Sequence, residues 1–214
     1  MMKTRLSVVV LAVVLLTAFG GAAQATVIDF DDVVAPDLFA ETGALREEYA
    51  GLGVHFVGPA DKDGAAIVND STWGVSAHSG LNILAVNPNA ADALLGGGTP
   101  QGPETILFDS LMGEVSIYVS GSGNADTFTI EAYDAMNALV DSDTVTTHDW
   151  ALLGVSSAAG IQRVVLAVPV YEGGSMFDDL SFTELAPAVP APAGILLGTL
   201  GTGLVGWLRR RRSL

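Results

Sequence analysis

The chain has 214 residues, of which 50% are hydrophobic, and it contains no cysteine. Disulfide bonds and thiol chemistry are therefore excluded. With 24 acidic against nine basic residues, its formal net charge is −15. Such a charge disfavours nucleic acid and anionic lipid as partners and favours cations.

The first 25 residues have the organisation of a secretory signal peptide. Lys3 and Arg5 supply positive charge, the segment from Leu6 to Phe19 is apolar, and Ala23-Gln24-Ala25 is a small-x-small cleavage box. This pattern predicts an exported protein that signal peptidase cleaves, so that the mature chain begins at Thr26. The alternative is an uncleaved signal anchor.

Residues 26–186 are predicted to form one domain, because about 160 residues suffice for a sizeable core. Only Arg46, Lys62 and Arg163 are basic within it, and all 24 acidic residues lie there, so its formal charge is −21. Without disulfides, its stability must come from core packing or from bound metal. Such an acidic surface is also typical of proteins that stay soluble in a salty or calcium-rich medium.

Nine short segments of this domain have the pattern of β-strands, with alternating apolar and polar residues or many β-branched ones. They are residues 27–30, 53–57, 81–86, 105–108, 114–119, 126–133, 138–140, 162–168 and 176–182. Turn-forming clusters separate them. This pattern predicts an all-β fold, a two-sheet β-sandwich. Residues 38–49 are predicted as a short surface helix or a loop, and residues 58–74 and 87–104 as long loops.

Two Phe-Asp-Asp motifs stand near the ends of the predicted domain, at Phe30-Asp31-Asp32 and Phe177-Asp178-Asp179. Alternation in the last strand places Asp178 on one face with three apolar residues, which predicts that this face is the core side. The face consists of Met176, Asp178, Leu180 and Phe182.

A buried ionised aspartate must be paired or bound to a cation, and no basic residue lies within ten positions of either motif. Calcium suits carboxylate and backbone oxygen ligands. We therefore regard Asp31, Asp178 and Asp179 as candidate ligands of one structural calcium. The alternative is that these aspartates face water or cap turns.

Carbohydrate binding requires a flat, exposed aromatic ring flanked by polar groups. Trp73, Trp150 and Tyr171 each stand next to a turn that contains Gly, Ser or Asp, and they are the candidates. The alternative for each is a place in the core.

No catalytic residues are predicted. The sequence contains no Gly-x-Ser-x-Gly or His-Glu-x-x-His motif, and its histidines, His55, His78 and His148, are dispersed. A hydrolase site assembled from distant residues stays an alternative.

The last residues, 187–214, form a tail of three parts. Val189-Pro190-Ala191-Pro192-Ala193-Gly194 is followed by an apolar segment that ends at Leu208. A helix over 193–208 is slightly short for a hydrocarbon core but can span it. The basic end, which should stay cytoplasmic, consists of Arg209, Arg210, Arg211 and Arg212.

This tail resembles the PEP-CTERM sorting signal of Gram-negative bacteria, in the variant that begins Val-Pro-Leu-Pro-Ala-Gly, with Ala191 in place of leucine. The resemblance implies an exosortase, a membrane-embedded transpeptidase, as partner. It also implies an inner-membrane precursor, removal of the tail, and delivery to the cell surface or extracellular matrix. The alternative is a membrane anchor that is never cut.

The domain is similar to jelly-roll, carbohydrate-binding-like domains that precede this sorting tail. The similarity lies in residues 28–32, 49–56 and 177–182. It implies a calcium that joins the terminal strands through Asp31, Asp178 and Asp179. We expect a non-enzymatic structural or adhesive protein of the cell surface or matrix. A module that binds exopolysaccharide is one alternative, and a hydrolase is another.

Overall fold

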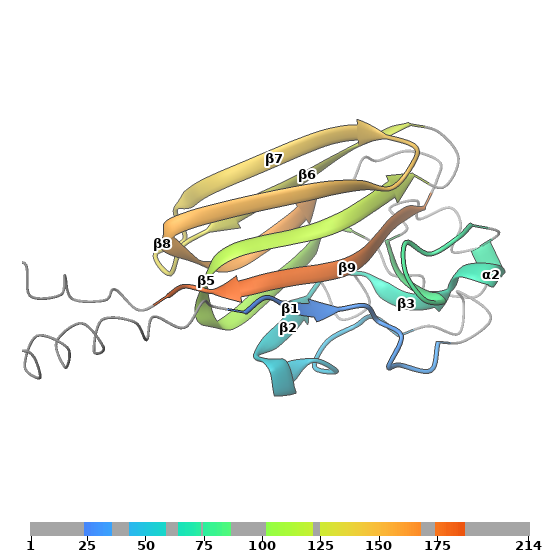
Figure 1. Ribbon diagram of the computed structural model, residues 1–214, viewed down its shortest axis with the longest axis horizontal. Coiled ribbons are helices and arrows are strands. Elements are labelled where there is room, and N and C mark those ends of the chain that lie inside the picture. The colour runs from blue at the N-terminus through green and yellow to red at the C-terminus, as the bar shows by residue number, and fades with distance from the viewer. Residues whose placement is uncertain are drawn as a thin grey trace, which may run out of the picture. The chain divides into compact units, whose positions relative to one another are not determined.

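The computed structural model describes residues 24–35, 43–58, 64–73, 75–86, 102–121, 125–167 and 174–186. Residues Ala23–Leu185 form one compact unit, and it is built from β-strands (Figure 1). The predicted all-β class is confirmed. No helix in the described ranges is long and apolar enough to cross a membrane. The predicted tail helix lies outside those ranges.

The described part of the domain contains nine strands and two short helical turns. The strands are β1 (Thr26–Ile28), β2 (Val54–Val57), β3 (Ala66–Asn69), β4 (Asn82–Val86), β5 (Glu104–Gly121), β6 (Asp126–Tyr133), β7 (Leu139–Thr147), β8 (Ala151–Ala167) and β9 (Ser175–Glu184). The turns are η2 (Ala50–Leu52) and α2 (Asp70–Trp73). All strand pairs are antiparallel.

In the described ranges the strands are paired into one continuous sheet, not into the two separate sheets that were predicted, and the long strands β5 and β8 belong to both layers into which this sheet folds. The first part of β5 pairs with β2 and with the end of β8, which continues through β6 to β7. The second part of β5 pairs with the start of β8 and with β9, which carries β4, β3 and β1. The register breaks between Leu107 and Glu114, where β5 passes from one layer to the other. Figure 1 shows β8, β5 and β9 side by side.

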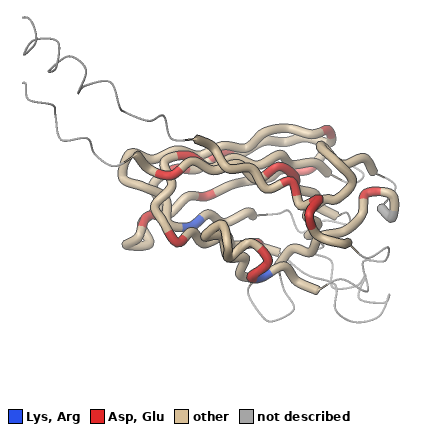
Figure 2. The backbone as a smooth tube through the Cα atoms, turned by 60° about the horizontal axis from the view of Figure 1, so that its bottom comes forward, with Lys and Arg blue, Asp and Glu red and all other residues tan. Residues whose placement is uncertain are grey.

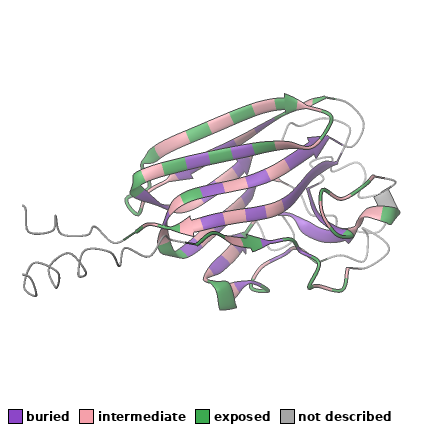
Figure 3. Cartoon of the chain, viewed as in Figure 1, coloured by how far each residue is buried: buried purple, intermediate pink, exposed green. Residues whose placement is uncertain are grey.

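The core lies between the layers. Phe128 of β6 contacts Phe177 of β9 edge to face, with ring centroids 6.1 Å apart, and Phe108 of β5 contacts Phe182 at 5.5 Å. Burial alternates along the long strands, as the stripes of Figure 3 show, because successive residues point to opposite faces. This alternation is the pattern that the sequence displays.

Strand β9 changes its neighbour halfway along its length. Its first residues pair with β4 and residues from Leu180 onward pair with β1. Its register against β5 shifts by one residue at the same place, and Asp179 has a left-handed backbone conformation (φ 50°). These are the features of a β-bulge.

The bulge shows that the predicted common face of β9 was wrong. Leu180 and Phe182 lie in the main core, as does Phe177, whereas Met176 packs in a small separate cluster. One extra residue reverses which face the following residues occupy. Asp178 therefore points to the side of Met176 and not toward Leu180 and Phe182.

Two aspartates of β7 cover the free edge of β8 in the other layer. Asp143 accepts the N–H of Gly154 at 3.0 Å and Asp141 accepts that of Ser156 at 2.8 Å. Each also accepts the N–H of the residue that follows it, at 2.8 and 2.9 Å. The exposed N–H groups of two strand edges are thereby satisfied without a further strand, which limits pairing with other chains.

A buried carboxylate holds the segment before β3 against β5. Glu104 is fully buried, and it accepts the N–H groups of Ala65 and, at 3.1 Å, of Thr105. Burial raises the pKa of its carboxyl to about 7, against the opposing effects of these N–H groups and the charge of Arg46. Figure 2 shows how sparse basic residues are: only Arg46 and Arg163 lie in the described ranges.

Several elements differ from their predicted limits. Strand β3 lies within a predicted loop, and β8 begins eleven residues before its predicted start at 162, because small residues mask its pattern. In the segment 38–49, residues 43–49 contain no helix. They form a loop, which is one of the two predicted alternatives, and Leu45 and Tyr49 are buried within it.

Candidate functional site

The first part of the site is the turn that follows β1. Phe30 has a left-handed backbone (φ 61°), and the N–H of Asp31 donates to Asp29 Oδ1 at 3.2 Å. Asp31 Oδ1 accepts the N–H groups of Leu81 and Asn82, both at 2.9 Å. The Asn82 side chain donates to two carbonyl oxygens of the turn, at 2.8 Å each. The turn is thereby joined to residues at the start of β4.

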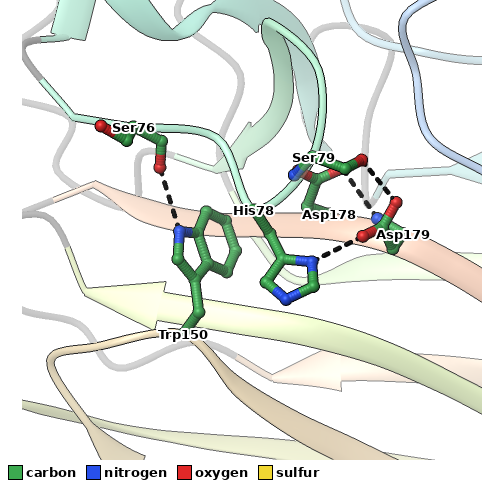
Figure 4. Close-up of polar contacts among 6 residues, drawn as sticks. All are labelled: Ser76, His78, Ser79, Trp150, Asp178 and Asp179. Atoms are coloured by element: carbon green, nitrogen blue, oxygen red, sulfur yellow. Dashed lines mark hydrogen bonds and ion pairs between the residues drawn. The ribbon is translucent and has the colours of Figure 1, made fainter.

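The second part is the bulge of β9 (Figure 4). Asp178 Oδ2 accepts the N–H of Ser79 at 2.9 Å, and Asp179 Oδ1 accepts the Ser79 hydroxyl at 2.7 Å. His78 Nδ1 lies 2.6 Å from Asp179 Oδ2. Residues 75–82, which we call the strap, are thus held at one end by both Phe-Asp-Asp motifs.

Asp178 is fully buried beneath the strap. Burial raises the pKa of its carboxyl to about 6, and the charge of Asp179 adds to this, while the N–H groups of Ser79 and Asp179 oppose it. The carboxylate therefore has backbone donors but no cation among the described contacts. The strap must also contain glycine at Gly80 (φ 55°), because a Cβ there would lie 1.3 Å from Asp31 Oδ2.

Trp150 holds the other end of the strap. Its indole Nε1 donates to the carbonyl oxygen of Ser76 at 3.0 Å, and the half-buried ring packs on the small cluster around Met176. The ring of His78 stacks on Tyr118, with centroids 3.6 Å apart, and meets the Trp150 ring edge to face at 5.8 Å. Figure 4 shows Trp150 and His78 next to each other on the strap side of the sheet.

A cleft with a volume of about 580 Å³ opens beside Trp150. Its apolar lining residues are Val75, Trp150 and Met176. Its polar part consists of Ser76, Ser120, His148 and Asp149. The Ser120 hydroxyl donates to the His148 carbonyl oxygen at 2.7 Å. An aromatic ring with polar groups beside it is the arrangement that sugar binding requires.

The structure brings four predicted site residues together along the strap: Asp31, Asp178, Asp179 and Trp150. Trp73 ends α2, and its side chain is not described. Ala25 is exposed. Ala23, Tyr171, the sorting motif at 189–194 and the basic residues 209–212 lie outside the described ranges.

Sequence reasoning missed the residues of the strap itself. Ser76 and His78 stand in a polar stretch before β4 with no motif around them, and Tyr118 is one of many alternating residues in β5. Their role depends on contacts with residues as far as 101 positions away. No signal in the local sequence could have assigned it.

The described contacts do not test the predicted calcium site. Within the described ranges, no three His, Asp or Glu side chains are grouped to hold a metal ion. Asp31, Asp178 and Asp179 instead receive N–H and O–H groups at successive positions of the strap. Structural calcium stays a prediction from the sequence. The hydrogen bonds to the strap are enough to explain why the three carboxylates lie where they do.

No protein-family model matches this sequence, and a comparison with curated proteins found no match. Among solved structures, an adhesin domain of Lys-gingipain is 13% identical with a TM-score of 0.49, over 75% of this chain and 99% of that domain. A second adhesin domain of the same protein, from Porphyromonas gingivalis, is 12% identical with a TM-score of 0.46, over 74% and 97%.

A variant of a family 29 carbohydrate-binding module is 12% identical with a TM-score of 0.41, over 76% of this chain and 93% of that module. At such low identities and TM-scores, the side chains of the cleft, and not these similarities, bear on what this chain binds.

We expect the free energy of unfolding to fall as the pH rises from about 4 to about 7. The pKa of Glu104 is raised from 4.5 to about 7 and that of Asp178 from 3.8 to about 6. Between these values the native state holds protons that the unfolded chain has released, so stability is greatest below the unfolded pKa values. Each group contributes up to about 3 kcal/mol.

Urea unfolding at several pH values across this range measures how steeply the free energy of unfolding falls with pH. Glu104→Gln combined with Asp178→Asn should flatten this decrease, whereas Glu114→Gln, which changes an exposed acid without a described hydrogen bond, should not. Stability that rises with pH in this range, and does so equally in the double variant, would contradict the prediction. Hydrogen bonds to Glu47 and Asp109 raise the pKa of His55. The free energy of unfolding should therefore fall further above pH 6.5, as His55 loses its proton.

We expect Asp31→Ala to lower the free energy of unfolding by about 1–2 kcal/mol, because two N–H groups of the strap lose their acceptor. The loss should be the same with and without EDTA if these hydrogen bonds are the main role of Asp31. Thermal unfolding of both chains under both conditions measures it. A wild-type melting temperature that falls in EDTA to that of the variant would establish the calcium site instead.

Proposed function

We propose that this chain is an exported surface or matrix protein whose β-domain binds carbohydrate and catalyses no reaction. The observation that carries this proposal is Trp150 at the wall of a cleft, with its N–H already bound to Ser76. Because this bond occupies the only polar group of the indole, the ring can offer only apolar surface to a ligand. The C–H face of a pyranose can stack on such a ring while the polar rim bonds its hydroxyls.

The strap beside this cleft is hydrogen-bonded at several points without any ligand. It is held by Asp31 at one end, by Asp178 and Asp179 next to it, and by Trp150 at the other. A preformed site loses less conformational entropy on binding than a flexible one. This favours a binding role for the cleft, and an adhesive one if the bound glycan belongs to the matrix. We also propose that the strands of the domain are arranged as a jelly roll.

The contacts of His78 favour binding over hydrolysis. Its Nδ1 contacts Asp179, as in a catalytic dyad, but the Ser79 hydroxyl donates to the same carboxylate and not to the imidazole. Among the described contacts, His78 therefore has no hydroxyl nucleophile hydrogen-bonded to it. Turnover of a glycoside or ester by the purified chain would establish the hydrolase alternative.

The sorting role is a proposal from the sequence. A signal peptide at one end, and a Val-Pro-x-Pro box, an apolar segment and four arginines in order at the other, support export followed by exosortase processing. The precursor would be held in the inner membrane by residues 193–208. The processed chain would then reach the cell surface or matrix.

We expect Trp150→Ala to weaken binding to the recognised glycan about tenfold or more, since buried aromatic contacts dominate such interfaces. Tyr133→Ala is the control, because Tyr133 is an aromatic residue outside the cleft whose ring is covered by Arg163 at 3.7 Å. A glycan array followed by calorimetry on the exported chain measures both. Equal affinity of the wild type and Trp150→Ala would remove the cleft from the proposal.

We expect Pro190→Ala combined with Pro192→Ala to make the full-length precursor accumulate in cells that contain an exosortase. Pro187→Ala, just outside the motif, should be trimmed normally. Mass spectrometry of the membrane and released fractions gives the ratio of full-length to trimmed chain, and it should find Thr26 as the first residue. Normal trimming of the double variant would show that the exosortase does not recognise the Val-Pro-x-Pro motif.

A further inference from the structure

We propose that the glycan bound in this cleft carries protonated amino groups, as a deacetylated hexosamine polymer does. This inference rests on the proposed carbohydrate-binding function and names the class of sugar. The proposal follows from the charges around the cleft.

Asp149 is the open acceptor of the cleft. Its side chain is 98% exposed, and its one described partner is His148, whose Nδ1 lies 3.4 Å from Asp149 Oδ1. The contact is long, and it is an ion pair only when His148 is protonated. The Asp149 carboxylate is thus free to accept a cation next to the ring of Trp150.

No lysine or arginine of the described ranges lines this cleft, and the one imidazole that does, His148, lies beside Asp149. Arg163 stacks on Tyr133 and donates to Asn137 Oδ1, and Arg46 lies next to Glu104. Neither lines the cleft. Uronic acid residues would be repelled by Asp149 and by the domain charge of −21. The same field draws a cationic sugar toward the site.

The ring and the carboxylate fit an amino sugar together. The apolar face of the pyranose stacks on Trp150, and an ammonium substituent at the edge of the sugar ring reaches the Asp149 carboxylate. An N-acetylated sugar keeps the stacking and loses the charge. The structure therefore predicts a ranking of three glycans: amine-bearing above N-acetylated, and N-acetylated above uronate.

The test measures binding of the exported chain by calorimetry to three oligomers of similar length. They are a β-1,4-glucosamine oligomer, its N-acetylated counterpart and a uronic acid oligomer, in buffer near neutral pH, where part of the sugar amines is still protonated and imidazole protonation is not favoured. We expect a several-fold preference for the amine over the acetylated oligomer, which decreases with added salt.

Three variants separate specific recognition from general attraction. Asp149→Asn should reduce the preference for the amine. Glu114→Gln, which removes the same charge about 20 Å from Ser120 along β5, should leave it unchanged. Trp150→Ala should weaken binding of both the amine and the acetylated oligomer.

The possible failures are distinct. Equal binding of the amine and acetylated oligomers by the wild type, or an equal effect of Asp149→Asn on both, would overturn the amine proposal and leave carbohydrate binding intact. Amine binding that is unchanged in Trp150→Ala would show general attraction to an acidic protein and would also overturn it. Failure of the wild type to bind any glycan would overturn the proposed function itself.

Discussion

The change of neighbour along β9 is the constraint from which the site follows. One edge of this strand pairs first with β4 and then with β1, and the strand bulges between them at Asp178 and Asp179. Backbone groups at such a break need other partners. The strap supplies donors to the two aspartate side chains, and the turn after β1 holds the strap from the other side. The position of the strap then determines where the ring of Trp150 is held.

The domain repeatedly pairs a carboxylate with backbone N–H groups. Asp178 does so under the strap, Glu104 does so at the start of β5, and Asp141 and Asp143 do so at the edge of β8. Basic residues are too few to neutralise 24 acids, and an N–H donor is the available partner for a carboxylate that cannot reach water. A donor of this kind does not fully offset the cost of desolvation, which is why the pKa values of Glu104 and Asp178 are raised.

The same acidity underlies the proposed preference of the cleft for an amine-bearing glycan. The ring of Trp150 and the exposed carboxylate of Asp149 beside it are placed by different parts of the fold. The first is a consequence of how the sandwich is closed at β9, and the second belongs to the loop between β7 and β8. Their proximity allows one ligand to use both. The proposed function combines such a site, which would adhere to a cationic polymer, with the proposed export and sorting of the chain to the cell surface.

The sequence alone determined the all-β class, because alternation with period two is local. It also pointed to the two Phe-Asp-Asp motifs and to Trp150, since aspartates without nearby bases and a tryptophan beside a turn are visible in one dimension. It did not determine the face of Asp178, because a single-residue bulge at Asp179 reverses alternation without leaving a composition signal. Nor did it place His78, Ser76 or Tyr118, whose partners are distant in the chain. Only the tertiary structure decided that the aspartates and the tryptophan hold the same segment, because strand pairing, and not local sequence, brings β1, β9 and the start of β8 together.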